Sequence, residues 1–321
     1  MDRTEWFYQK KWGIFLHYLF QNMNDPKSPS NMGLGDIGWE QCLQLFDAER
    51  FADALNQVGC GYVMVTTMQL NKYLLAPNEI YDRITGYKPG EATPHTDFIL
   101  KLYNALERRG IDLFLYFTGD GPALDERAGE AFGYRGYHPN KTKVTKEFVQ
   151  KWSMVMKEWS LKYGNKIKGW WLDGCYRLIG YDEELLNIMA DAARAGNPDA
   201  LIACNYYGCL DEYGCIQRQV RMGSPVCDFT AGEQVYFGDM PYAPFIEGTR
   251  WHILSYLGKS RDNTEINGWG AIGCRYSGEY MHNYVKEIHR RGGIVTIDIC
   301  PFCDGHIDPE QYAVLEHLKN I

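Results

Sequence analysis

The stretch Lys166-Ile-Lys-Gly-Trp-Trp-Leu-Asp-Gly174 decides how the chain is interpreted, because it predicts a short buried strand that ends in a carboxylate. Apolar residues dominate from Ile167 to Leu172, and Asp173 and Gly174 follow where the strand would end. In a barrel of parallel strands, reactive groups lie at the C-terminal strand ends. A carboxylate in that place, beside aromatic rings that can stack on a sugar, is typical of a nucleophile. Asp173 is therefore the first candidate catalytic residue.

Composition limits the classes of partner. With 321 residues, 45% of them hydrophobic, the chain can bury a large core as one α/β barrel or as two ordinary domains. Its formal net charge of −8 argues against nucleic acid or an anionic membrane as a partner. The first residues lack the pattern of a signal peptide, and no apolar run is long enough to span a bilayer. We therefore expect a cytoplasmic protein, and the sequence leaves open a homo-oligomer.

The ten cysteines lack the spacing of a disulfide framework, which favours reduced thiols. Cys300-Pro-Phe-Cys303, followed by His306, has the spacing of a redox or zinc element. The chain has no second Cys-x-x-Cys pair that would complete a zinc site. We therefore expect no metal and no cofactor.

Buried-type strands alternate with amphipathic helices along the whole chain, which predicts the α/β class. The region 236–273 is the least regular, and we predict a short helix near Trp251 and a strand near Ala271 there. Eight strands are expected, at 12–19, 62–68, 112–118, 167–172, 201–205, 226–229, near 271 and at 294–299. This pattern predicts one (β/α)8 TIM-like barrel, a single domain over residues 1–321. A doubly wound open sheet is the alternative, but no glycine-rich nucleotide loop follows a strand.

The side chains at the predicted strand ends are rich in carboxylates, amides and aromatic rings. Amides and carboxylates bind sugar hydroxyls, and two carboxylates across a glycosidic bond are the minimum needed to hydrolyse it. The candidates for such a site are His17, Gln69, Asn71, Tyr116, Asp120, Trp171, Asp173, Asn205, Tyr207, Glu233, Trp269 and Asp298.

Several segments resemble the α-L-fucosidase family of retaining glycoside hydrolases, and the resemblance covers most of the chain. Lys11-Trp-Gly-Ile-Phe-Leu-His17 resembles the family's first strand with its histidine, and residues 46–52 with 61–66 resemble its first helix and second strand. Trp171-Leu-Asp-Gly174 resembles the segment with the nucleophile, and Asp228-Phe-Thr-Ala-Gly-Glu233 the segment with the acid/base of some members. Residues 292–301, with Asp304-Gly305 and Ile307, resemble the last strand and its turn.

The resemblance implies roles for these residues. Asp173 would be the nucleophile, His17 would bind a sugar hydroxyl, and Glu233 would be the acid/base, as in some members of the family. Glu247, in Pro244-Phe-Ile-Glu-Gly248, is the rival acid/base, because other members take the acid from that region. Asp298 is a third candidate, although its place on a buried strand favours a structural hydrogen bond. In a retaining enzyme the two carboxyl groups lie roughly 5–5.5 Å apart.

The chain also departs from the family pattern. The family has a pair of histidines after its second strand, where this chain has Gln69 and Leu70, and an arginine where Tyr207 aligns. We expect no counterpart of the family's C-terminal β-sandwich in these 321 residues. The resemblance thus supports a fucosidase fold more strongly than it supports fucose as the substrate.

Simpler interpretations remain for single residues. Asp173 would then only cap a turn, Glu233 would be a solvated loop glutamate, and His17 would be a core histidine. The resemblance implies a retaining exo-glycosidase acting on an α-L-fucoside or a related small glycoside. The alternative is a non-catalytic carbohydrate-binding relative. A metal-dependent lyase or isomerase is disfavoured because the sequence shows no convergent His/Asp/Glu cluster.

Overall fold

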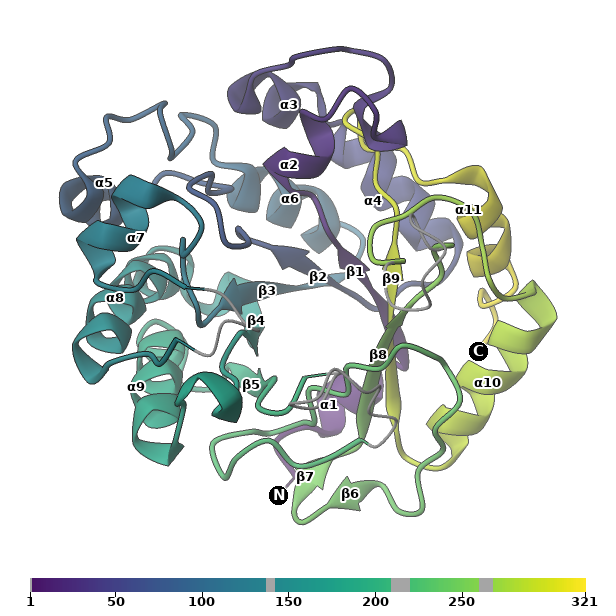
Figure 1. Ribbon diagram of the computed structural model, residues 1–321. Helices are drawn as coiled ribbons and strands as arrows, with labels where there is room; N and C mark the ends of the chain where they lie inside the picture. The colour runs from purple at the N-terminus through teal and green to yellow at the C-terminus, as the bar shows by residue number, and fades with distance from the viewer. Residues whose placement is uncertain (1, 137–141, 209–219, 260–267) are drawn as a thin grey trace.

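The computed structural model describes residues 2–136, 142–208, 220–259 and 268–321. Its main feature is a curled sheet of seven parallel strands in the order β5-β4-β3-β2-β1-β9-β8 (Figure 1). The strands are β1 (Trp12–Leu16), β2 (Tyr62–Thr66), β3 (Asp112–Thr118), β4 (Ile167–Asp173), β5 (Leu201–Cys204), β8 (His252–Tyr256) and β9 (Ile294–Ile299). A short antiparallel hairpin, β6 (Phe245–Ile246) and β7 (Thr249–Arg250), precedes β8.

Helices cover the outer side of the sheet (Figure 1). The longer ones are α4 (Ala48–Gln57), α6 (Phe98–Glu107), α8 (Lys146–Tyr163), α9 (Glu183–Arg194), α10 (Gly278–Arg290) and α11 (Pro309–Glu316). The shorter ones are α1 (Glu5–Tyr8), α2 (Phe20–Met23), α3 (Trp39–Leu45), α5 (Glu79–Thr85) and α7 (Glu126–Phe132). Each of the six longer helices begins at an Asp, Ser or Thr whose side chain accepts a backbone N–H of the first turn, which satisfies an otherwise unpaired donor.

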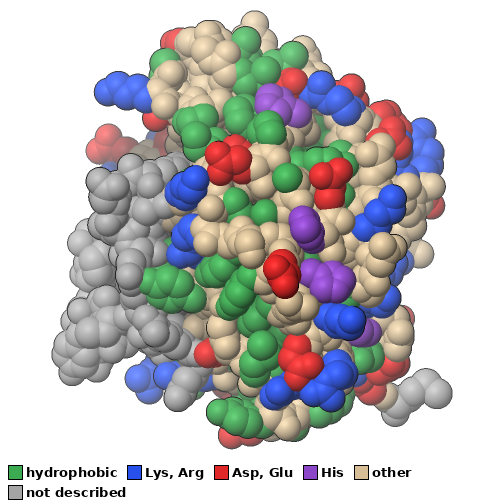
Figure 2. Space-filling model, turned by 90° about the vertical axis from the view of Figure 1, so that its right-hand side faces the viewer, with side chains coloured by type: hydrophobic (Ala, Val, Ile, Leu, Met, Phe, Trp, Pro, Cys, Tyr) green, Lys and Arg blue, Asp and Glu red, His purple; other side chains and the backbone are tan. Residues whose placement is uncertain are grey.

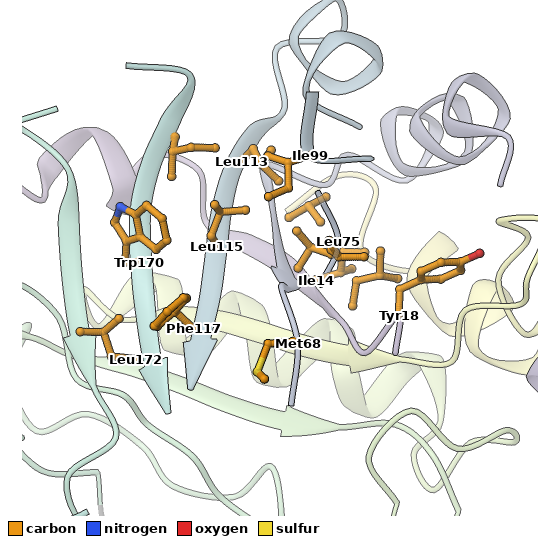
Figure 3. Close-up of a cluster of buried hydrophobic side chains, with 14 of the residues drawn as sticks. Ile14, Tyr18, Met68, Leu75, Ile99, Leu113, Leu115, Phe117, Trp170 and Leu172 are labelled. Atoms are coloured by element: carbon orange, nitrogen blue, oxygen red, sulfur yellow. The ribbon is translucent and has the colours of Figure 1, made fainter. Parts of the chain in front are cut away.

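The sheet separates two hydrophobic cores, because neighbouring side chains on a strand point to opposite faces. Trp170 belongs to the outer core beneath the helices, together with Leu115 and Phe117 of the adjacent strand (Figure 3). Trp171 belongs to the inner core, where its ring stacks on that of Tyr116 with a centroid distance of 5.7 Å. The two consecutive tryptophans thus serve different layers, and only the second one faces the interior of the curled sheet.

The predicted closed eight-stranded barrel is wrong in strand number, because the sixth strand expected at 226–229 does not form. The segment 228–234 crosses from β5 to β8 with isolated backbone contacts. Asp228 N donates to Ile202 O at 2.8 Å, and Leu254 N donates to Gly232 O at 2.9 Å. The sheet is therefore an open, barrel-like one, bridged at its edge by an irregular segment.

Two further predictions in the irregular region are also wrong. Trp251 does not lie in a helix but directly precedes β8. Ala271 does not lie in a strand but in a turn, where Gly270 adopts a φ of +58°. Both errors fall in 236–273, where apolar residues follow neither the helix nor the strand period.

Helix α1 fills the end of the curled sheet opposite to the C-terminal strand ends. Phe7 is fully buried in the inner core and packs against the rings of Tyr62 and Phe114, with centroids 4.8 and 4.9 Å away. The buried guanidinium of Arg250 donates to Thr4 Oγ1 at 2.9 Å and forms ion pairs with Asp2 and Glu5. The N-terminal residues therefore close this end of the fold.

The outer surface on the α10–α11 side carries acidic and basic side chains that alternate over the face (Figure 2). No large area of one charge is visible in that view. Among the described residues, no helix has the length and apolar character needed to cross a bilayer.

Candidate active site

A cavity of about 300 Å³ lies at the C-terminal ends of the strands. Most of the candidate site residues meet in its wall. The lining consists of Phe15, His17, Leu19, Gln21, Asn22, Gln69, Tyr116, Trp171, Asp173, Glu233, Leu254 and Trp269.

Asp173 occupies the last position of β4, and three side chains donate hydrogen bonds to its carboxylate. The hydroxyl of Tyr116 donates to Oδ2 at 2.7 Å, and that of Tyr176 donates to Oδ1 at 2.9 Å. Asn205 Nδ2 also donates to Oδ1 at 2.9 Å. These bonds compensate the negative charge of the carboxylate and fix its orientation toward the cavity.

The two tyrosines keep their protons. Burial raises the pKa of Tyr116 and of Tyr176 well above the usual value, and the negative charge of Asp173 adds to the effect. Both hydroxyls are therefore permanent donors to Asp173 at any pH at which an enzyme works.

Asn205, directly after β5, connects the two candidate catalytic carboxylates. Its Nδ2 donates to Glu233 Oε2 at 2.6 Å as well as to Asp173 Oδ1. Its Oδ1 accepts from Gly208 N at 3.1 Å, which sets the amide so that the NH2 group faces the carboxylates. The two carboxylate oxygens share one nitrogen, so they are at most about 5.5 Å apart, the sum of the two distances.

The backbone around Glu233 is pinned to β8. Leu254 N donates to Gly232 O, and Gln234 N donates to Leu254 O, both at 2.9 Å. Gly232 has a φ of +68°, and a Cβ there would collide with the carbonyl oxygen of His252. Only glycine fits this approach, and it allows the chain to carry Glu233 over the end of β8.

His17 and Trp269 form another wall of the cavity. His17 Nδ1 lies 2.5 Å from Oδ1 of the buried Asp298. Gly270 N donates to Oδ2 of the same carboxylate at 2.6 Å. The rings of His17 and Trp269 have centroids 5.6 Å apart, so Asp298 orients the histidine and also holds the turn that presents the tryptophan.

Two other predicted residues complete the lining. Trp171 donates its indole N–H to Ala231 O at 3.0 Å, so its ring is fixed below the cavity. Gln69 Nε2 lies 3.3 Å from the hydroxyl of Tyr116 and extends the chain of hydrogen bonds that ends at Asp173.

The described lining of the cavity leaves out six residues named from the sequence, and two of these, Asn205 and Asp298, bond directly to lining residues; the six are Asn71, Asp120, Asn205, Tyr207, Glu247 and Asp298. Asn71 is one contact away, because its amide bonds to the lining residue Gln21. Tyr207 is 37% exposed and lies under the guanidinium of Arg221, 5.1 Å from the ring centroid. Glu247 occupies the β6–β7 turn, which precedes the N-terminal end of β8 and thus lies at the opposite end of the strands.

Other residues around Asp173 were not assigned a role from the sequence. Tyr176 lies three residues after Asp173 in the following turn, and no periodicity marked it. Asn205 and Asp120 were expected at strand ends, but without a function. Burial raises the pKa of the Asp120 carboxyl to about 7, Asp173 adds to this rise, and a hydrogen bond from Thr118 opposes it.

The side chains of Cys300 and Cys303 are buried. The described part of the chain contains no cluster of three or more His, Cys, Asp or Glu side chains suited to a metal ion.

Comparison with known proteins places the chain in a family. A family model described as α-L-fucosidase matches residues 36–219. No curated protein sequence matches the chain.

Solved structures share the fold. One is a bacterial fucosidase with a monovalent iminocyclitol inhibitor, at 16% identity over 99% of this chain and 74% of that chain, with a TM-score of 0.63. Another is a Bacteroides thetaiotaomicron α-L-fucosidase trapped as a covalent intermediate, with the same identity and coverage and a TM-score of 0.64. An endo-fucoidan hydrolase of glycoside hydrolase family 107 has 14% identity, over 99% of this chain and 53% of that chain, and a TM-score of 0.68. Since the family model covers more than half of the sequence, the chain belongs to the α-L-fucosidase family of glycoside hydrolases.

Proposed function

We propose that the protein is a retaining exo-glycosidase, with residues 1–321 forming one catalytic domain. Asp173 is the nucleophile and Glu233 the acid/base. The observation that carries the proposal is the shared donor Asn205, which keeps the nearest oxygens of the two carboxylates no more than about 5.5 Å apart. A retaining enzyme has a separation of about 5–5.5 Å, whereas an inverting enzyme needs about 6.5–9.5 Å for a water molecule between the groups.

The reaction has two steps. In the first, Asp173 attacks the anomeric carbon, the glycosidic C–O bond breaks, and protonated Glu233 gives its proton to the leaving oxygen. In the second, Glu233 as carboxylate takes a proton from water, the water oxygen attacks the anomeric carbon, and Asp173 leaves as a carboxylate. The three donors around Asp173 hold it for attack along one direction.

The substrate proposed is an α-L-fucoside or a related small glycoside. A cavity of about 300 Å³ is at the lower end of ligand sites and suits a single sugar residue. His17, Gln69 and Trp269 supply hydroxyl partners and an apolar ring face. The Bacteroides enzyme was trapped as a covalent intermediate with 2-fluoro-fucosyl fluoride, which supports the same two-step chemistry on this fold.

The non-catalytic alternative gains nothing from the geometry. It would be favoured if neither candidate acid approached Asp173 across the cavity. Glu247 is remote, but Glu233 faces Asp173 within the same cavity wall.

The first test removes the nucleophile. Asp173→Asn should lower turnover of nitrophenyl α-L-fucoside by a factor of about 10³ or more, because the amide cannot form the glycosyl ester. Glu247→Gln is the matched control, since it makes the same kind of change outside the cavity, and it should retain wild-type turnover. Both variants should keep the wild-type circular dichroism spectrum.

The stereochemistry of the first-formed sugar provides the second half of this test. Proton NMR of the early product should show the anomer of the substrate. An inverted product, or full activity of Asp173→Asn, would overturn the mechanism.

A further inference from the structure

The segment that follows Glu233 is held by side chains instead of a strand. Arg275 Nη2 donates to Val235 O at 2.7 Å. The Tyr276 hydroxyl accepts from Phe237 N at 3.0 Å, and the Tyr280 hydroxyl donates to Phe237 O at 2.6 Å. The Tyr284 hydroxyl donates to Asp239 O at 2.7 Å. These bonds thus involve the backbone of alternate residues of the segment, Val235, Phe237 and Asp239.

The four-residue step from Tyr280 to Tyr284 in the helix matches the two-residue step from Phe237 to Asp239 in the segment. Two residues of extended chain advance by about 6.6 Å, and four residues of a helix advance by about 6 Å. Tyr276, Tyr280 and Tyr284, which we call the tyrosine ladder, are four residues apart along α10 and the residues just before it. Their rings are stacked, with centroids 5.3 and 6.1 Å apart and planes tilted by only 14° and 8°. Tyr276 and Tyr280 thus bind the N–H and the C=O of Phe237, and Tyr284 binds the C=O of Asp239, two residues further along the segment.

The other side of the segment is attached to β8. Arg275 Nη2 also donates to Tyr256 O, the last residue of β8, at 3.1 Å, and its guanidinium lies 4.0 Å from the centroid of the Tyr256 ring. Glu233 itself is bridged to Leu254. The chain after Glu233 therefore runs between β8 and α10, as Figure 1 shows for the green stretch that leads to β6.

We propose that the tyrosine ladder and Arg275 are positioning residues for Glu233. They replace the sheet hydrogen bonds that a sixth or seventh strand would have given to this segment. This inference rests on the proposed role of Glu233 as the acid/base.

Misplacement of an acid affects some substrates more than others. A glycoside with a poor leaving group needs the proton from Glu233, whereas an activated aryl leaving group departs without it. A shift of about 1 Å in a catalytic group can reduce a rate by about 10²-fold. A loosened Glu233 should therefore reveal itself as a dependence on the leaving group.

The test compares a dinitrophenyl with a methyl α-L-fucoside. Glu233→Ala sets the scale and should lose about 10²–10⁴-fold on the methyl glycoside and much less in formation of the glycosyl-enzyme from the activated one. The double variant Tyr280→Phe/Tyr284→Phe keeps both stacked rings and removes only the two hydroxyls. It should lose about tenfold in kcat/KM on the methyl glycoside and less than about threefold on the dinitrophenyl glycoside.

Tyr312→Phe is the matched control, because its hydroxyl bonds to Ala54 and Gln57 on the outer face of α4. It should leave both rates unchanged. The single Tyr280→Phe variant, at a residue 43% exposed, provides a milder change with the same expected selectivity.

The outcomes separate the two proposals. Equal losses on both glycosides, or no loss, in the ladder variants would overturn the positioning role while Glu233→Ala still shows leaving-group dependence. If Glu233→Ala itself shows no such dependence, the assignment of the acid/base is overturned.

Discussion

Asp120 links the stability of the protein to pH through a single buried carboxyl. It lies behind Asp173, and a Cβ at Gly174 would be only 2.5 Å from its Oδ1. Its pKa rises from 3.8 to about 7, chiefly because burial penalises the charged form. Ionised Asp173 and the thiol of Cys175 face it from the next strand and loop, and Tyr134 and Tyr181 face it from the outer side.

The sign of the pH effect follows from proton binding. Between pH 3.8 and about 7 the unfolded chain has released this proton and the folded protein still holds it. The contribution of Asp120 to the free energy of unfolding therefore falls as the pH rises through this window, by about 4 kcal/mol in total. Asp120→Asn lacks the titration. Relative to wild type, the variant should gain stability between pH 4.5 and 7.5 in urea unfolding. A constant difference would show that Asp120 ionises normally.

Single residues differ in how well the sequence predicts them. Asp173 could be located because it ends a mostly apolar run, and strand ends converge at one face. The sequence offered two acids for the second carboxylate, and the structure brings only Glu233 into the cavity. Tyr176 was missed because its position depends on the conformation of a turn. The two hydrogen bonds that Asn205 donates, to Asp173 and to Glu233, form only because two distant segments meet, and no local sequence pattern predicts that meeting.

At the level of elements, the junction after β4 depends on glycine. Gly174 has a φ of +60°, and its approach to Asp120 and Thr118 leaves no room for a Cβ. Gly110, between α6 and β3, has a φ of +68° with nothing within 4 Å of an added Cβ. Alanine at Gly110 would therefore cause backbone strain alone, whereas alanine at Gly174 would cause backbone strain and a steric collision.

Alanine at these two glycines should give different costs. Gly110→Ala should lower the free energy of unfolding by about 1 kcal/mol, the cost of a left-handed backbone for alanine. Gly174→Ala adds overpacking and should cost a further 1–3 kcal/mol or so, together with activity, since Asp173 is adjacent. Urea unfolding and kcat measure both effects. Equal stability losses would mean that the site relaxes freely.

Helices and strands were predictable where the backbone is held by regular backbone–backbone hydrogen bonds. The strands β1 to β5 and β9 are mostly apolar segments, and the longer helices between them have a clear period and an N-terminal cap. Residues 226–240 lack such a signal because side chains of Arg275 and the tyrosine ladder hold their backbone. A segment stabilised by side chains far along the chain has no period of its own, so neither its missing strand nor the nature of 251–256 could be deduced.

For the whole molecule, we expect the free energy of unfolding to be most sensitive to a substitution at the end that α1 fills, opposite to the C-terminal ends of the strands. Phe7 fills the inner core from α1, where its ring lies against those of Tyr62 in β2 and His252 in β8. Phe7→Ala should lower the free energy of unfolding by about 3–5 kcal/mol, as is usual when a buried aromatic ring is removed. Trp6, on the same short helix, is only partly buried, so Trp6→Ala should cost less. A larger loss of unfolding free energy for Trp6→Ala than for Phe7→Ala, measured by urea unfolding, would contradict this role of α1.

The pairing of β1 with both β2 and β9 predicts an order of assembly. Strands β1 to β5 are neighbours in sequence and in space, so they can associate while the rest of the chain is still being synthesised. Strand β9 pairs Ile297 with Ile14, near the other end of the chain, and contacts of such long sequence separation form late. Asp173 belongs to the early part and Glu233 to the late part. We therefore predict that the proposed nucleophile takes its place before the proposed acid/base, and that activity appears only after the last strand has paired with the first.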